Sequence, residues 1–263
     1  MDKLHKAIKY CLWTAWVEDE KPVSLIIIGN PEVGKTSAIE KFKENNGIVY
    51  FNDVTPWGLT KELYKYRDLG KPINHIMIPD FLNILSKSQT SAKAMIQFLN
   101  SGIEEGLDRI QTFGITIDIP KLQFGIITAI TTQAFKMRRN HWNNIGFGSR
   151  MIPFSYKYSI ADAQEIIKSI FEQVYHNEKK SSLNFPDEKQ KVELNPKLAE
   201  MMHPYTQRLA SSEKLYGFRH QKQMQVLLKA IALSKKKNKV DKKDVKELQI
   251  IAEYFNLEFN MLE

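Results

Sequence analysis

The sequence predicts an α/β protein, in which a mostly parallel five-stranded sheet is followed by an all-helical region. Three observations support this fold class. Short apolar runs alternate with helix-like segments in the first part of the chain, and the hydrophobic period becomes helical from Ser159 onward. A glycine-containing loop also joins the first apolar run to a helix. With 263 residues, of which 43% are hydrophobic, the chain can bury a core.

Each element follows from its own local pattern. Strands are predicted where β-branched and aromatic runs end in turn residues: 24–28, 47–51, 75–78, 122–130 and 151–156. A further strand, 113–117, is expected to join 122–130 around a turn at Ile119 and Pro120. Helices are predicted at 35–44, 59–66 and 91–107 in the first part, and at 196–209, 218–234 and 240–254 in the second. Ser159 and Asp162 have the spacing of a capping box that starts another helix.

The loop after the first predicted strand fits the phosphate-loop pattern G-x-x-x-x-G-K-[ST]. Its glycines let successive backbone N–H groups point inward around a phosphate, and the following helix adds its positive N-terminal dipole. Lys35 would neutralise the β- and γ-phosphates, and the Thr36 hydroxyl would bind Mg²⁺. The expected cofactor-binding residues are Gly29, Asn30, Pro31, Glu32, Val33, Gly34, Lys35, Thr36 and Ser37.

A second magnesium ligand should end another buried strand, because ligands gather at the carboxyl ends of strands in open α/β sheets. Asp80 follows the strand 75–78 and meets this requirement. Asp53 also ends a strand and is the second candidate, while a helix N-cap is the alternative role for Asp80. Thr36 and Asp80 are therefore the expected metal ligands.

The order of these parts resembles the AAA+ family of ATPases, and in particular the compact members encoded by phages, plasmids and other mobile elements. The resemblance covers nearly the whole chain. It implies a P-loop ATPase core over residues 1–158, a helical lid domain over residues 159–263, and ATP with Mg²⁺ as cofactors. The segment 239–245 resembles the start of the last lid helix of such proteins.

The resemblance also implies roles for polar residues outside the loop. Thr131 or Thr132 stands where the family has its sensor 1 residue, Arg150 where it has an arginine finger, and Arg219 where it has the sensor 2 arginine. Arg138 and Arg139 compete with Arg150, and ordinary surface or ion-pair roles are alternatives for both Arg150 and Arg219. The implied catalytic set is Lys35, Asp80, Thr132, Arg150 and Arg219.

One position departs from the family pattern. The family usually has a glutamate after the Walker B aspartate, where it activates the attacking water, but here Phe81 follows Asp80. The candidates to replace that base are Glu32, Asp53, Glu104 and Glu105. ATP binding is thus more strongly predicted than fast hydrolysis.

The charge is unevenly distributed along the chain. The formal net charge is +8, and residues 119–161 contain no Asp or Glu. That segment includes Arg150, which we expect to reach a neighbouring subunit's γ-phosphate without a carboxylate of its own chain beside it. The other cations of the segment are Lys121, Lys136, Arg138, Arg139 and Lys157.

Other classes of protein are disfavoured by composition. A single cysteine excludes an internal disulfide framework, and no histidine pair has the spacing of zinc ligands. No apolar run approaches the roughly 20 residues needed to cross a bilayer, and the first residues lack a secretory core. We therefore expect a cytoplasmic protein without a membrane partner.

Three functions are compatible with these patterns. The first is a DNA-associated ATPase that hydrolyses ATP between the subunits of a ring or filament. DNA contacts are expected from residues 136–142, where cations surround Trp142, although an intersubunit surface explains that segment as well. The second is an ATPase that remodels or assembles a protein partner without DNA. The third is a slow or non-hydrolysing scaffold gated by ATP.

Overall fold

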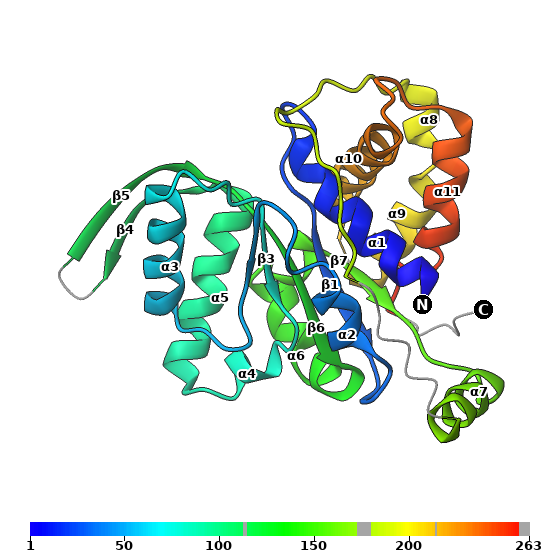
Figure 1. Cartoon of the computed structure of the whole chain (residues 1–263), viewed down its shortest axis with the longest axis horizontal. Helices are drawn as coiled ribbons and strands as arrows, with labels where there is room; N and C mark the ends of the chain where they lie inside the picture. The colour runs from blue at the N-terminus through cyan, green and yellow to red at the C-terminus, as the bar shows by residue number, and fades with distance from the viewer. Residues whose placement is uncertain (113–114, 173–179, 214, 258–263) are drawn as a thin grey trace.

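The structure, a computed structural model, describes residues 1–112, 115–172, 180–213 and 215–257, with the backbone alone described at 110–112, 115–120 and 213. In this part of the chain it is α/β, with a five-stranded, all-parallel sheet of order β2-β3-β6-β1-β7 (Figure 1). The strands are β1 (Ser24–Gly29), β2 (Ile48–Tyr50), β3 (His75–Ile78), β6 (Gly125–Thr131) and β7 (Met151–Ser155). The predicted fold class and sheet are confirmed at this level.

Strand β1 lies between β6 and β7 in the sheet. Leu25 is level with Ile127 of β6 and with Ile152 of β7, and all six residues of β1 are buried. Strands buried on both faces read as continuous apolar runs, which explains the isoleucine-rich sequence of β1. The three strands β1, β6 and β3 therefore end at one common, carboxyl edge.

Alternate residues of β1 enter two separate hydrophobic clusters, one on each face of the sheet. Ile26 and Ile28 pack with the helices that follow β2, β3 and β6, whereas Leu25 and Ile27 pack with the chain's first and last helices. The former helices are α3 (Pro56–Asp68), α4 (Leu82–Leu85), α5 (Gln89–Glu104) and α6 (Thr132–Asn144). The second face is covered by α1 (Asp2–Trp13), η1 (Thr14–Trp16), α2 (Lys35–Glu40), and the C-terminal helices.

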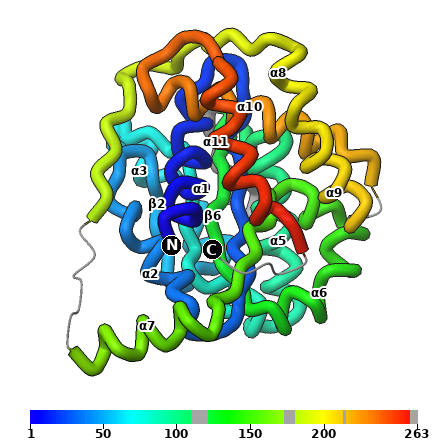
Figure 2. Tube along the Cα trace, turned by 90° about the vertical axis from the view of Figure 1, so that its right-hand side faces the viewer, coloured from blue at the N-terminus to red at the C-terminus, as the bar shows by residue number. Residues whose placement is uncertain are grey.

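The C-terminal helices α10 and α11 lie beside α1 (Figure 2), and residues of the C-terminal helices share this second hydrophobic cluster with the sheet. They are α8 (Pro196–Glu200), α9 (His203–Glu213), α10 (Phe218–Ser234) and α11 (Lys242–Ala252). Phe154 of β7 stacks on Tyr254 with ring centroids 5.4 Å apart, and the Ser155 amide donates to the Tyr254 carbonyl at 2.9 Å. The proposed boundary at residue 158 therefore does not separate two hydrophobic cores.

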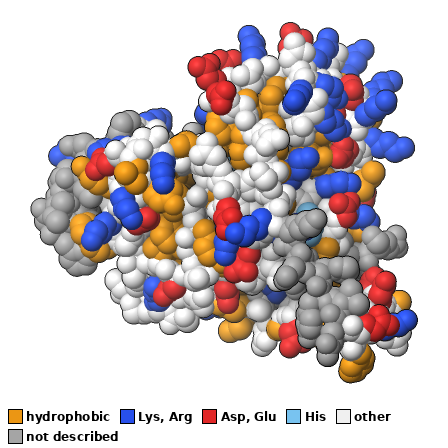
Figure 3. Space-filling model, viewed as in Figure 1, with side chains coloured by type: hydrophobic (Ala, Val, Ile, Leu, Met, Phe, Trp, Pro, Cys, Tyr) orange, Lys and Arg blue, Asp and Glu red, His pale blue; other side chains and the backbone are white. Residues whose placement is uncertain are grey.

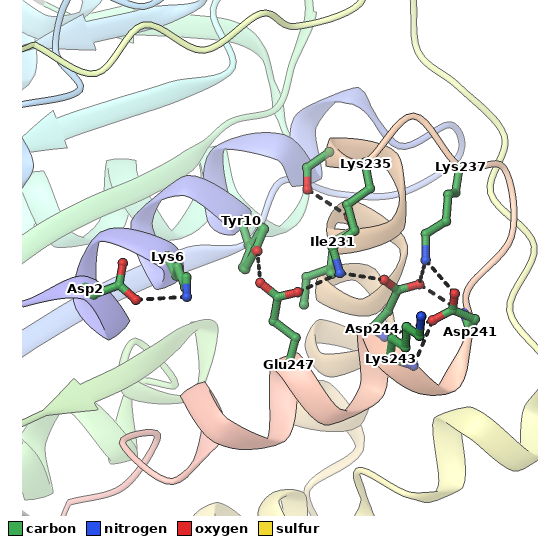
Figure 4. A network of polar contacts seen from close by, with 11 residues as sticks. Asp2, Lys6, Tyr10, Ile231, Lys235, Lys237, Asp241, Lys243, Asp244 and Glu247 are labelled. Carbon is green, nitrogen blue, oxygen red and sulfur yellow. Dashed lines mark hydrogen bonds and ion pairs between the residues drawn. The ribbon is translucent and has the colours of Figure 1, made fainter. Parts of the chain in front are cut away.

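A polar network joins α1 to α11 at the edge of that cluster (Figure 4). Tyr10 donates its hydroxyl hydrogen to Glu247, and burial together with this bond raises the pKa of the Tyr10 hydroxyl. Lys235 bridges Glu247 at 2.6 Å and the fully buried Asp244 at 2.9 Å. Lys237 adds a second cation to Asp244. The buried carboxylate is thus paired with two ammonium groups, which buried charges require.

Several elements differ from their predicted limits. Residues 119 and 120 lie inside β5 (Ile115–Leu122), which pairs antiparallel with β4 (Leu107–Thr112), so the turn predicted there is wrong. Pro120 is tolerated because it lies between the paired residues 118 and 122, where the register shifts. Helix α1 was not expected from the mixed sequence of its first residues. The helix predicted over 196–209 is divided into α8 and α9.

Helix α7 (Ile160–Phe171) projects from the body of the molecule (Figures 1 and 2). It begins with the predicted capping box, in which Ser159 and Asp162 exchange side-chain and backbone hydrogen bonds. Every residue of this helix is described, and none is buried. Among the described helices, none has both the length and the apolar character that a membrane span requires.

Candidate functional site

The phosphate-loop residues connect the end of β1 to the start of α2. Glu32 and Gly34 both have positive φ angles, 66° and 75°, so the backbone curls sharply before Lys35. A Cβ at Gly34 would come within 2.9 Å of the Met1 Cε atom, in addition to the strain of its φ. The loop therefore has the tight curvature that the glycine pattern predicts, and α2 begins at Lys35 as expected.

Lys35 lies over the mouth of this loop. Its ammonium donates to the Gly29 carbonyl at 3.0 Å and to the Asn30 carbonyl at 2.5 Å. Burial lowers the pKa of Lys35, while the carboxylate of Asp80 acts in the opposite direction. The ammonium is thus close enough to Asp80 to interact with it, and its hydrogen-bond partners among the described residues are carbonyl oxygens that a phosphate can replace.

Two tyrosines hold the loop from β7 and the residues after it. The Tyr156 hydroxyl donates to the Val33 carbonyl at 2.6 Å, and the Tyr158 hydroxyl donates to the same oxygen at 3.1 Å. Both residues were missed by the sequence reasoning, because the contacts join positions more than 120 residues apart. The alternating Tyr-x-Tyr at the end of a predicted strand was the available signal.

The other loop residues divide into buried and exposed positions. Gly29 and Val33 are buried, Gly34 and Lys35 are half-buried, and the other five positions are exposed. The exposed positions are Asn30, Pro31, Glu32, Thr36 and Ser37. An exposed Thr36 hydroxyl at the start of α2 is accessible to a metal ion held by bound phosphates.

Asp80 follows β3 at the carboxyl edge of the sheet, as predicted. Its Oδ1 accepts a hydrogen bond from the Leu82 amide at 3.0 Å, although Phe81 and not Asp80 is the N-cap residue of α4. One carboxylate oxygen can serve the amide while the other faces a ligand. Asp53, the second candidate, pairs with Lys87 at 2.7 Å on the surface.

The tip of β6 lies between the phosphate loop and Asp80, because β6 runs between β1 and β3. Thr131 is level with Gly29 in the sheet, and its hydroxyl caps α6 by accepting from the Ala134 amide at 3.3 Å. Thr132 is the first residue of α6 and is half-buried. The structure thus places Thr131 and Thr132 beside the phosphate loop, and the Thr131 hydroxyl is bonded to the Ala134 amide.

Thr36 and Asp80 fit the coordination chemistry of magnesium. Mg²⁺ takes a few protein oxygens and completes its octahedral shell with water and phosphate. In the part of the chain that the structure describes, no group of three or more His, Cys, Asp or Glu side chains could hold a metal alone.

Arg150 and Arg219 meet at the opposite, amino edge of the sheet. Arg150 precedes β7, and along β7 the distance from Arg150 to Tyr156 is about 20 Å. The Arg219 guanidinium donates to the Ser149 hydroxyl at 2.9 Å. Neither arginine is therefore beside the phosphate loop of its own chain.

Glu104 links the two arginines. Its Oε2 lies 3.4 Å from Arg150 Nε and 3.2 Å from Arg219 Nε, and its Oε1 lies 3.6 Å from Lys21. Burial lowers the pKa of Arg150, and the neighbouring Arg219 adds to this effect. The expectation that Arg150 has no carboxylate of its own chain beside it is wrong, because α5 supplies one that the acid-free segment does not contain.

The four candidate bases lie in different places. Glu104 and Glu105 end α5 near the arginines, at the amino edge of the sheet, and Asp53 is paired with Lys87. Glu32 belongs to the phosphate loop and is exposed. Phe81, at the position where a base was expected, is fully buried.

In residues 136–142, the expected stacking of Trp142 on a nucleic-acid base is wrong. Trp142 is buried against Phe81 and Phe147, so its ring cannot stack on a base. Arg139 donates to the Ser212 carbonyl and ties α6 to α9. Lys136 and Arg138 remain on the outer part of α6.

Comparison with models of known protein families finds no match, and comparison with curated proteins finds no significant match. What the site does must therefore be inferred from its geometry.

Proposed function

We propose that the chain binds Mg-ATP at the phosphate loop and acts as an AAA+-type ATPase whose turnover depends on self-assembly. The observation that carries the proposal is the position of Lys35. Its half-buried ammonium lies at the mouth of a curled loop, within electrostatic reach of Asp80, at the edge where three parallel strands end. These are the features by which a protein recognises a polyphosphate with its cation.

Each residue of the proposed site has a defined part in binding. Lys35 exchanges its two carbonyl partners for phosphate oxygens, and backbone N–H groups of the loop donate to the same phosphates. Tyr156 and Tyr158 keep the Val33 carbonyl turned away from the bound anion by donating to it. Thr36 and Asp80 hold the Mg²⁺, which would offset phosphate charge during transfer of the γ-phosphoryl group.

Completion of the site by a second subunit is supported by where the arginines lie. A single chain has no arginine of this pair near its own loop, but a neighbour in a head-to-tail assembly could present Arg150 and Arg219 together. A trans arginine increases phosphoryl-transfer rates by about 10³–10⁵-fold in well-studied ATPases and GTPases. Since Glu104 pairs with both arginines, we expect slow ATP turnover in the isolated chain.

We place such an ATPase in the cytoplasm.

The first test is binding of Mg-ATP to Lys35→Ala, measured by isothermal titration calorimetry. Loss of a charge-assisted contact is expected to weaken binding by roughly tenfold or more. Lys43→Ala is the matched control, because Lys43 is an exposed lysine on the same segment that contacts only the Tyr50 ring in the described contacts. Equal binding by Lys35→Ala and wild type would refute the phosphate-loop proposal.

DNA association is the second candidate function, and the cationic outer face of α6 is the observation that favours it. If phosphates are its target, affinity for DNA falls linearly with salt on logarithmic axes, since bound phosphates release counterions. Steady-state turnover with and without DNA then separates this function from a protein-remodelling ATPase. ATP-dependent assembly without turnover would instead support a nucleotide-gated scaffold.

A further inference from the structure

Helix α7 presents an apolar stripe that no described part of the chain buries. Ile160 is 82% exposed and Phe171 is 80% exposed, although both are large hydrophobic residues. Ile166, Ile167 and Ile170 lie on the same side of the helix and are also exposed. Figure 3 shows hydrophobic side chains among charged ones at the lower right, where α7 lies in Figure 1. A 12-residue helix is marginal alone in water, so this stripe indicates a partner.

A second exposed apolar surface precedes α10. Tyr216 and Phe218 are 89% and 75% exposed, and their rings stack with centroids 5.6 Å apart. Together with Leu215 they line a groove of about 360 Å³. Arg219 and Lys222 lie in the same groove, so the aromatic surface has a cationic border.

The two surfaces carry opposite charge. Helix α7 has Asp162 and Glu165 with a single cation, Lys168, which pairs with Glu172 at 3.7 Å. The aromatic groove contains Arg219, Lys222 and only one carboxylate, Glu104, which is already shared by two arginines. Charge complementarity of this kind steers two surfaces together and disfavours contact between like surfaces.

The surfaces also lie at opposite edges of the sheet. Helix α7 begins two residues after Tyr158, which bonds to the phosphate loop at the carboxyl edge. The aromatic groove adjoins Arg219, which bonds to Ser149 at the amino edge. Two complementary patches at opposite ends of one molecule form a head-to-tail contact, which closes into a ring or continues as a filament.

We propose that the apolar stripe of α7 docks into the Leu215–Tyr216–Phe218 groove of a second copy of this chain. We choose a second copy as the partner because each chain carries both the acidic, apolar helix α7 and the cationic, aromatic groove. These two surfaces lie at opposite edges of the sheet, so one chain cannot bring its own pair into contact. The contact joins the phosphate-loop edge of one copy to the arginine edge of the next. Its consequence for ATP turnover rests on the proposed function, whereas the docking itself does not.

Two other occupants fit the charges less well. An anionic bilayer attracts helices rich in Lys and Arg, but α7 has more acidic than basic residues. Pairing of α7 with α7 of another copy would bring the two acidic helices together. Both alternatives give measurably different results in the experiment below.

Sedimentation velocity without nucleotide tests the contact. The first variant is Ile167→Ser with Ile170→Ser, and the second is Tyr216→Ser with Phe218→Ser. Wild type is expected to assemble as its concentration rises, and each double variant is expected to remain monomeric. An equimolar mixture of the two variants is expected to form dimers only, because each retains the half that the other has lost.

Controls keep folding and docking apart. Ala161→Ser with Ser169→Ala alters the opposite face of α7 and should assemble like wild type. Both serine variants should unfold at the wild-type temperature, since all four replaced side chains are exposed. A lower melting temperature of the α7 variant as a monomer would show that α7 packs on its own chain and would overturn the proposal.

Three further outcomes would also overturn it. Assembly of the groove variant alone would mean that α7 pairs with itself. If the wild type remained monomeric up to about 100 μM, the dissociation constant of the contact would be too high for the proposed assembly. Binding of monomeric wild type to phosphatidylserine vesicles would identify the occupant as a membrane. Because nucleotide is absent, failure of ATP binding would leave each of these results unchanged.

Discussion

At the scale of single residues, His75 is a titratable group that the fold removes completely from water. Its ring is fully buried at the start of β3, and Nε2 lies 3.2 Å from the Val23 carbonyl, which can only accept a hydrogen bond. Nδ1 is buried without a partner in the described part of the chain. Burial therefore lowers the pKa of His75 from 6.5 to about 4.

We predict that the protein becomes less stable as the pH is lowered, because of this residue. The unfolded chain binds a proton near pH 6.5 and the folded chain only near pH 4, so the free energy of unfolding decreases as pH falls between these values. The full loss is about 3 kcal/mol. His75→Gln, which retains a donor for Val23, should lessen this dependence in urea titrations at several pH values. His203→Gln, at an exposed histidine, should not change it.

Residues of the candidate site were predictable where the signal is local. Gly29, Gly34 and Lys35 form a continuous motif whose conformation depends on neighbours in the sequence, and the backbone curls there as expected. Glu104 could not be found in this way. It meets Arg150 and Arg219 because the end of α5, η2 (Gly148–Arg150) and the start of α10 lie at the same edge of the sheet, and no spacing rule relates these positions.

At the scale of elements, the segment from β3 to α4 explains why no acidic base follows Asp80. Phe81 stacks on Phe147 with centroids 5.7 Å apart and meets Trp142 edge-on at 5.7 Å. This aromatic cluster fixes α4 and α6 against the sheet. The position is a packing position, and a carboxylate there would be buried without a cation among the described contacts.

We therefore predict that Phe81→Glu lowers stability by about 3–5 kcal/mol and does not increase ATP turnover. Differential scanning calorimetry and steady-state turnover give the two readouts. Phe81→Leu, which retains apolar volume, should cost less and leave ATP binding unchanged. Faster turnover by a folded Phe81→Glu protein would contradict this interpretation of the segment.

Elements were predictable where one periodicity dominates. The limits of α10, Phe218–Ser234, agree with the helical pattern, although in its second half the helix is buried on nearly all sides, from Val226 to Leu233, and not on one face alone. The turn predicted at residues 119 and 120 failed because proline was read as a break, whereas pairing with β4 continues past it. Helix α1 was missed because its charged residues alternate with single apolar ones, although seven of its residues are buried.

At the scale of the whole molecule, the C-terminal helices complete the core of the sheet. Leu25, Ile27 and Phe154 of the sheet share one hydrophobic cluster with α1, α10 and α11. The network of Tyr10, Lys235 and Glu247 adds polar links between the first and last helices (Figure 4). A change of period at Ser159 marked where helices begin, but periodicity does not show which surface those helices cover.

This shared core predicts that the chain unfolds as one cooperative unit. Urea unfolding followed by circular dichroism and by tryptophan fluorescence should give coincident transitions. A fragment of residues 1–158 should lack a cooperative thermal transition, because Phe154 loses Tyr254 and Phe255 while β1 and α1 lose apolar cover. It should also bind a hydrophobic dye. If that fragment folded and bound Mg-ATP alone, the core and the helical region would be separate domains. The polar links between α1 and α11 would then contribute little to stability, as exposed ion pairs do.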